Sequence, residues 1–155
     1  MLNNWFSKQG TKKREYLIKI VVDEEGAIDR SATHSRPGGN EFLIDITPAS
    51  NGAPLASVTA HELGHVLGSI FETPGYRADP RITNPQHANL LLERGIPLFP
   101  EEQGRMIASE TEAWDIAEEM GNAVSLKDRE HSLASYRKGA EFAKNFWKGY
   151  RAPWQ

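Results

Sequence analysis

Cysteine is absent from the 155-residue sequence, and its absence removes several kinds of chemistry. Disulfide bonds, thiol nucleophiles and zinc sites with thiolate ligands are all excluded. Any metal ion must therefore be held by histidine or carboxylate side chains. A chain without cysteine also fits a reducing compartment.

Long apolar runs are absent too. No stretch approaches the length of a transmembrane helix, and residues 1–14 are polar and lysine-bearing, without the apolar segment of a signal peptide. We therefore expect a cytoplasmic protein with no membrane partner. Secretion by a route that needs no cleavable signal would leave no trace in the sequence, so it stays open.

Neither sign of charge dominates the sequence. The chain has 18 Lys and Arg residues against 21 Asp and Glu residues, a net charge of −3, and no block of like charge long enough to suggest a nucleic-acid-binding arm. A nucleic-acid partner is therefore not expected. The length suits one domain with one hydrophobic core, which we expect to span residues 1–155 with a flexible arm at residues 1–14.

Two short segments have the composition of β-strands. Residues 16–23 and residues 41–47 are rich in β-branched and aromatic residues and are bounded by turn-forming residues. Between them, residues 29–40 are rich in Ser, Gly, Pro and Arg, which predicts a loop.

Three longer segments have the apolar periodicity and the boundary signals of helices. They lie at residues 54–70, 100–120 and 127–148, the last with a side-chain cap at Ser125. The first helix should bury an apolar face against the strands. That face consists of Leu55, Val58, Val66 and Ile70.

Residues 72–100 are rich in proline and hard to assign. Only one short helix, at residues 87–94, is predicted there. A connection of this length in a small domain is usually functional or mobile. The order of the elements predicts an α+β fold with a short mixed sheet, followed by one helix that carries the main motif and two further C-terminal helices.

That motif is His61-Glu62-Leu63-Gly64-His65, an H-E-x-x-H pattern within the first predicted helix. Residues four apart project from the same face of a helix, so both imidazoles can bind one divalent metal ion. Glu62 lies about 100° round the helix from His61, where its carboxylate can act on a water molecule without binding the metal. The motif predicts a zinc hydrolase, although five-residue matches also arise by chance on exposed helices.

A catalytic zinc ion typically takes three protein ligands, so one more is needed. In the three-histidine version of the motif, the last histidine would stand where this chain has Phe71, whose ring cannot bind zinc. Glu110 is the better candidate, because helical periodicity places it in the middle of the apolar stripe of its helix. A buried carboxylate requires a compensating positive charge, which a metal ion supplies. The alternative is an ion pair between Glu110 and a buried arginine or lysine.

Two other polar residues are expected at the surface. Glu112 lies about 200° round the helix from Glu110, on the polar face, and is interpreted as a solvated glutamate. His34 stands in the predicted loop and is interpreted as a surface residue.

The H-E-x-x-H motif, followed by a helix that reads Glu110-x-x-Ala113, resembles the motifs of the gluzincin metallopeptidases. Among these, the ImmA/IrrE-like peptidases of bacteria and their mobile elements have a Glu-x-x-Ala-Asn motif, and here Trp114 stands in place of the asparagine. Residues 37–40, before a strand and the motif helix, also resemble toxin-type metallopeptidases of bacterial effectors. The resemblance covers the two motif helices and implies a zincin-like domain. In such a domain Zn²⁺ would be bound by His61, His65 and Glu110.

The resemblance also implies hydrolysis of peptide bonds. Glu62 would act as the general base on a water molecule and would pass the proton to the leaving amine. His131 and Tyr136 are our first candidates for stabilising the oxyanion, ahead of Arg137, Tyr76 and His87. The substrate would be a protein or peptide that pairs with the edge strand beside the motif helix, and residues 41–47 are the expected edge.

Two other functions stay open from the sequence. The scaffold could serve as a non-catalytic interaction module, although Glu62 argues against this because a purely structural metal site needs no general base. The same chemistry could also belong to a secreted toxin-type protease, which would differ in its target and compartment.

Overall fold

A computed structural model describes residues 15–23, 32–35, 39–47, 55–120 and 124–150, which form three strands and six helices. In chain order these are β1 (Leu17–Val22), β2 (Ala32–Ser35), β3 (Glu41–Ile46), α2 (Leu55–Phe71), α3 (Pro74–Ala78), α4 (Pro80–Thr83), α5 (Pro85–Glu93), α6 (Pro100–Glu119) and α7 (Leu126–Gly149). The structure is a small α+β domain with a short mixed sheet, as predicted. The arm expected at residues 1–14 lies outside the described residues. Among the described helices, none combines the length and hydropathy required to cross a membrane.

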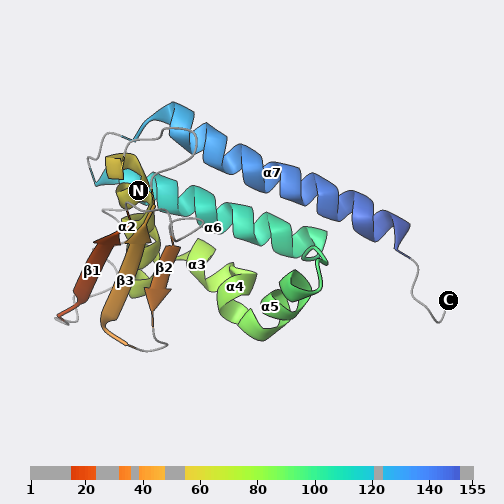
Figure 1. Cartoon of the computed structure of the whole chain (residues 1–155), viewed down its shortest axis with the longest axis horizontal. Coiled ribbons are helices and arrows are strands. Elements are labelled where there is room, and N and C mark those ends of the chain that lie inside the picture. The colour runs from red at the N-terminus through yellow and green to blue at the C-terminus, as the bar shows by residue number, and fades with distance from the viewer. Residues whose placement is uncertain (1–14, 24–31, 36–38, 48–54, 121–123, 151–155) are drawn as a thin grey trace.

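The sheet has the strand order β1-β3-β2, with β1 parallel and β2 antiparallel to β3 (Figure 1). Two predictions are wrong here. Residues 32–35 form a strand inside the predicted loop, because pairing with β3, and not the local composition Ala-Thr-His-Ser, creates it. The strand at residues 41–46 is central, so it is not the sheet edge that we expected to receive a substrate.

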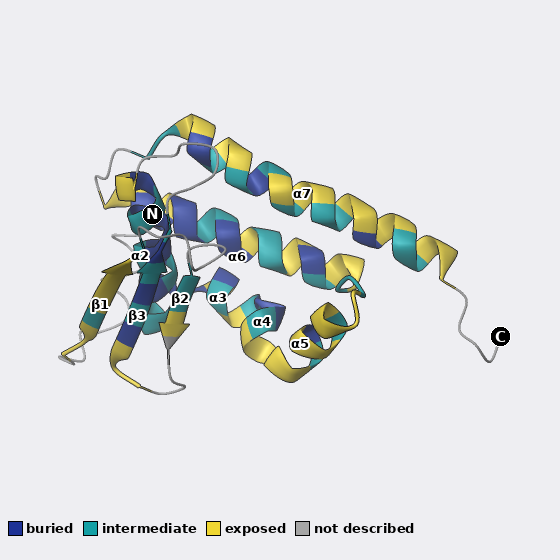
Figure 2. Ribbon diagram, viewed as in Figure 1, coloured by how far each residue is buried: buried dark blue, intermediate teal, exposed yellow. Residues whose placement is uncertain are grey.

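The core lies between β3 and α2. Alternate residues of β3 are buried, as the pleat of a strand requires, and they pack with Val66 of α2. Figure 2 shows the burial concentrated where the sheet, α2 and α6 meet. Leu55 was expected in this core but is 42% exposed, since it is the first residue of α2. The buried residues of β3 are Phe42, Ile44 and Ile46, and Val58, Leu63 and Ile70 of α2 are partly buried against them.

The segment after α2 contains three short helices where one was predicted. Each of α3, α4 and α5 begins with a proline in its first turn, where the missing N–H has no intrahelical partner to lose. The side chains of Asp79 and Asn84 cap α4 and α5. The sequence pattern missed α3 and α4 because helices of 5 and 4 residues are too short to show an apolar period.

The two long helices α6 and α7 lie side by side and run in opposite directions (Figure 1). The predicted cap of α7 is confirmed, since Ser125 Oγ accepts a hydrogen bond from the Asp128 N–H at 3.4 Å. At the far end of α7, Trp147 Nε1 donates to the carbonyl oxygens of Pro97, at 3.1 Å, and Leu98, at 3.2 Å. The end of α7 is thereby joined to the start of α6.

Gly64, inside the H-E-x-x-H motif, marks the closest approach of two helices. A Cβ atom added there would lie 2.1 Å from the carbonyl oxygen of Ala113 on α6. The obstacle is backbone, which cannot rotate away as a side chain can. The backbones of α2 and α6 therefore come into contact only because residue 64 has no side chain.

We predict that Gly64→Ala lowers the free energy of unfolding by about 3 kcal/mol, because the two helices must separate to admit the methyl group. Urea denaturation followed by circular dichroism measures this change. Gly104→Ala is the matched control, since a Cβ at this exposed helical position has nothing within 4 Å. It should raise the stability by about 0.5–1 kcal/mol. Equal effects of the two substitutions would contradict the tight helix contact.

Candidate metal centre

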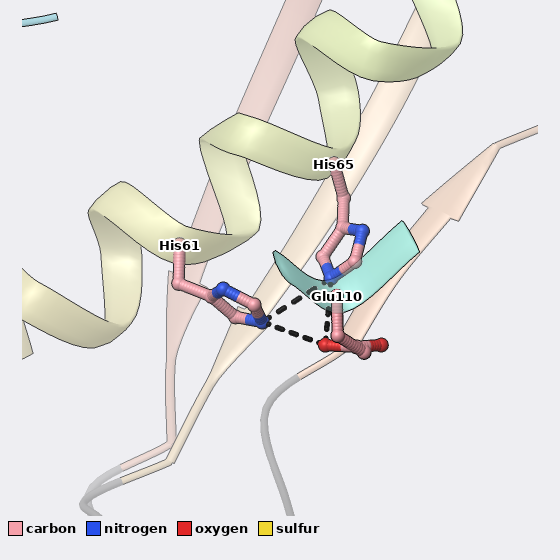
Figure 3. Close-up of side chains that lie close together, drawn as sticks. All are labelled: His61, His65 and Glu110. Atoms are coloured by element: carbon pink, nitrogen blue, oxygen red, sulfur yellow. Dashed lines mark hydrogen bonds and ion pairs between the residues drawn. The ribbon is translucent and has the colours of Figure 1, made fainter. Parts of the chain in front are cut away.

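Three side chains from two helices converge at one point (Figure 3). His61 and His65 project from one face of α2, and Glu110 reaches them from α6. Their Nε2 and Oε2 atoms form a triangle. The sides are 3.1 Å from His61 to Glu110, 3.2 Å between the two histidines and 3.3 Å from His65 to Glu110.

The triangle is held inside the protein by close packing. Glu110 is only 2% exposed, as its place in the apolar stripe of α6 predicted. Trp114, one turn further along α6, stacks on the ring of His61 with a centroid distance of 4.3 Å and an interplanar angle of 28°. Because indole and imidazole face each other, the orientation of His61 is fixed by α6 as well as by its own helix.

These residues fit a zinc ion. Ligand atoms around a tetrahedral zinc, at bond lengths of about 2.0–2.1 Å, lie about 3.3 Å apart, close to each side of the triangle. Two imidazoles and one carboxylate are also a donor set that catalytic zinc uses. His61 Nδ1 is buried and has no hydrogen-bond partner among the described residues, so its ring is held by stacking on Trp114.

The electrostatics of Glu110 suit a ligand that stays ionised. Burial raises the pKa of Glu110, but hydrogen bonds with His61 and His65 and the positive charge of Arg81 outweigh this and hold the pKa below its ordinary range. For His65, burial lowers the pKa, yet the hydrogen bond and charge of Glu110 and the charge of Glu62 raise it overall. The carboxylate is therefore charged at neutral pH.

Arg81 is the positive partner that the sequence did not identify. Its Nη2 atom lies 2.7 Å from Glu110 Oε1, while the other oxygen of Glu110 faces the histidines. From the sequence alone, metal ligation and an ion pair to arginine were alternative roles for Glu110. Because its two oxygens have different partners, Glu110 can have both roles at once. No periodicity could have found Arg81, since it follows a helix cap in a proline-rich segment.

Glu62 is buried beside this cluster and has a fixed orientation. It is 7% exposed, and its Oε2 atom accepts a hydrogen bond from the Thr33 hydroxyl at 2.7 Å. The same hydroxyl lies 3.2 Å from the main-chain oxygen of Glu62. Thr33 belongs to β2, so the strand that the sequence did not predict holds the residue predicted to be the general base.

Of the two residues predicted to stabilise an oxyanion, the structure brings one to the cluster. Tyr136 is partly buried, and burial, followed by the negative charge of Glu110, raises its pKa, while Arg81 opposes the shift. His131 is exposed, because five residues on a helix turn it about 140° away from Tyr136.

Among the lower-ranked candidates, Arg137 pairs with Glu130, and His87 pairs with Glu102. His34 is exposed, as expected, and pairs with Asp45 across the sheet at 3.1 Å.

The prediction for Glu112 is wrong. It is not a solvated glutamate, because its carboxylate accepts hydrogen bonds from the Thr73 hydroxyl and from two backbone N–H groups at the start of α3. The donors at 2.9 and 3.3 Å are the N–H groups of Gly75 and Tyr76. The partners belong to a short helix that the sequence did not predict, so they could not be foreseen. Glu112 thus anchors the segment after α2 to α6.

Comparison of the chain with family models, with curated proteins and with solved structures finds no match. The case for a metal centre therefore depends on the positions and chemistry of its own side chains.

We predict different results for the two glutamates of α6. Glu110→Ala should abolish stoichiometric zinc binding, measured by elemental analysis and calorimetry, because one of three ligands is lost. Glu112→Ala should keep the zinc but lower the free energy of unfolding by about 1–3 kcal/mol, since buried donors lose their acceptor. The control is Glu119→Ala, at an exposed position of the same helix. Equal zinc retention by the Glu110 and Glu112 variants would rule out Glu110 as a ligand.

Proposed function

We propose that the chain is a zinc-dependent peptidase, with His61, His65 and Glu110 as metal ligands and Glu62 as the general base. The observation that supports this is the convergence of three donor atoms within 3.3 Å of one another beside a buried and oriented glutamate. A zinc ion bound there would act as a Lewis acid toward a carbonyl group and would lower the pKa of a water molecule.

Glu62 then performs the proton transfers. Glu62 is buried, follows His61 directly on α2, and its negative charge helps to raise the pKa of His65. Thr33 donates to Oε2, and the second oxygen, Oε1, would take a proton from water and deliver it to the leaving amine. A buried carboxylate is costly in free energy, and this role accounts for its presence better than a non-catalytic scaffold does.

The edge strand β2 supports a peptide as the substrate. Among the described strands, β2 pairs with β3 alone and lies at the sheet edge, and Thr33 of the same strand contacts Glu62. An extended peptide that added to β2 through main-chain hydrogen bonds would therefore bring a peptide bond close to the general base. This replaces residues 41–47, which are central in the sheet, as the substrate-binding strand.

Tyr136 is the candidate for stabilising the oxyanion. A phenol of ordinary pKa, about 10, is already protonated at neutral pH, and burial raises the pKa of Tyr136 further, so its hydroxyl is a hydrogen-bond donor. His131 has no such position, because it is exposed.

We predict that the purified protein binds about one zinc per chain and that Glu62→Gln keeps the metal but lowers peptide cleavage by about 10²–10⁴-fold, because the amide cannot accept the proton. Elemental analysis and cleavage of a peptide library measure the two effects. Glu119→Gln, at an exposed position, should leave both unchanged. Protein that is isolated without metal and takes up none on addition of zinc would disprove the proposed function.

We also predict that Thr33→Val lowers kcat about tenfold with unchanged zinc content, because Glu62 loses the hydroxyl that orients it. Thr33→Ser, which keeps the hydroxyl, should retain most of the activity. Steady-state kinetics on a cleaved peptide test this. If the valine and serine variants were equally active, the hydrogen bond would have no part in catalysis.

A further inference from the structure

Arg81 has two carboxylate partners, one on each side. Its Nη2 atom lies 2.6 Å from Asp79 Oδ2 and 2.7 Å from Glu110 Oε1. Its Nε atom donates to Asp79 Oδ1 at 3.0 Å. The guanidinium group therefore lies between a residue of the short-helix segment and the proposed metal ligand.

Asp79 fixes where this guanidinium group can be. It is almost completely buried, and its Oδ1 atom also accepts the backbone N–H of Arg81 at 2.9 Å, which caps α4. The carboxylate thus binds both the backbone and the side chain of one residue. Such a double contact leaves the planar guanidinium few orientations, so its direction toward Glu110 is set by the fold.

The two oxygens of Glu110 have different partners. Oε1 pairs with Arg81, and Oε2 lies 3.1 Å from His61 Nε2 and 3.3 Å from His65 Nε2. A carboxylate without such a partner can rotate and bind a metal ion through both oxygens. The second oxygen would then occupy a position that a catalytic zinc site keeps open for water or substrate.

We infer that Arg81, held by Asp79, is a positioning residue of the metal centre: it restricts Glu110 to ligation through one oxygen and so keeps one coordination position open. This inference rests on the proposed zinc site. It also gives a function to α4, which lies in the stretch of residues 72–100 that was hard to assign from the sequence, because α4 carries Arg81 to the centre. Glu112 holds the start of the same segment on α6.

Metal binding to the full chain tests the inference directly. We expect Arg81→Met to lower the zinc affinity, measured by competition with a chelator, by about 10–100-fold. With Co²⁺ as the probe, the wild-type protein should give the strong visible absorption of four-coordinate cobalt, and Arg81→Met the weaker absorption of a higher coordination number. Arg81→Lys should be intermediate, since lysine keeps the charge without the planar fork. Arg77→Met is the control, because Arg77 is exposed and pairs with Glu72.

Variants of Glu110 show whether Arg81 acts through that ligand. In a Glu110→Ala background, where stoichiometric zinc binding is lost, Arg81→Met should change the weak metal affinity that the two histidines retain by less than twofold. Circular dichroism of the metal-free proteins establishes that each variant is folded. If the methionine variant does not fold, the lysine variant carries the test, and a cobalt spectrum and affinity equal to the wild type would overturn the inference.

Two further outcomes also decide the matter. A variant at Arg81 with unchanged metal affinity and spectrum but a raised KM would assign the residue to substrate binding and overturn the inference while the peptidase stands. Wild-type protein that binds neither Zn²⁺ nor Co²⁺ would overturn the proposed function and, with it, this inference.

Discussion

The backbone contact between α2 and α6 at Gly64 and Ala113 is the constraint on which the candidate centre depends. Glu110 lies almost one turn before Ala113, so the distance between these helices decides whether its short side chain reaches His61 and His65. Trp114 follows Ala113 and stacks on His61 for the same reason. A glycine in the motif is thus a requirement of packing, because any larger side chain would separate the helix that carries His61 and His65 from the helix that carries Glu110.

Two buried or partly buried carboxylates project from different faces of α6, and the negative charge of each is stabilised by its own partners. Glu110 is balanced by Arg81 and by the imidazoles, and Glu112 by the N–H groups at the start of α3. Arg81 and the N–H groups of α3 both connect α6 to the segment between α2 and α6. The electrostatic cost of burying these charges is therefore offset by contacts that also hold in place a proline-rich segment whose Ile82, Leu90 and Leu92 side chains are exposed.

The small sheet contributes to the same site from the other side. Its central strand supplies the core under α2, and its edge strand β2 supplies Thr33 to Glu62. In the proposed peptidase, this edge would receive an extended substrate next to the base that acts on the scissile bond. Thr33, which orients the proposed base, and the backbone that would bind the peptide then belong to the same strand. The position of β2 would therefore set both the orientation of Glu62 and the position of the substrate.

The sequence by itself determined the features that depend on local periodicity. The positions of His61 and His65 one turn apart, the place of Glu110 in an apolar stripe and the extent of the long helices follow from 3.6 residues per turn, whatever surrounds them. The tertiary structure alone decided the pairing of β2, the central place of β3 and the partners Thr33, Arg81 and Asp79. Each of these joins segments far apart in the chain or lies in a helix of four residues, where no period can develop. Long-range pairing depends on which surfaces come together when the chain folds, and the pattern of a single segment does not contain that information.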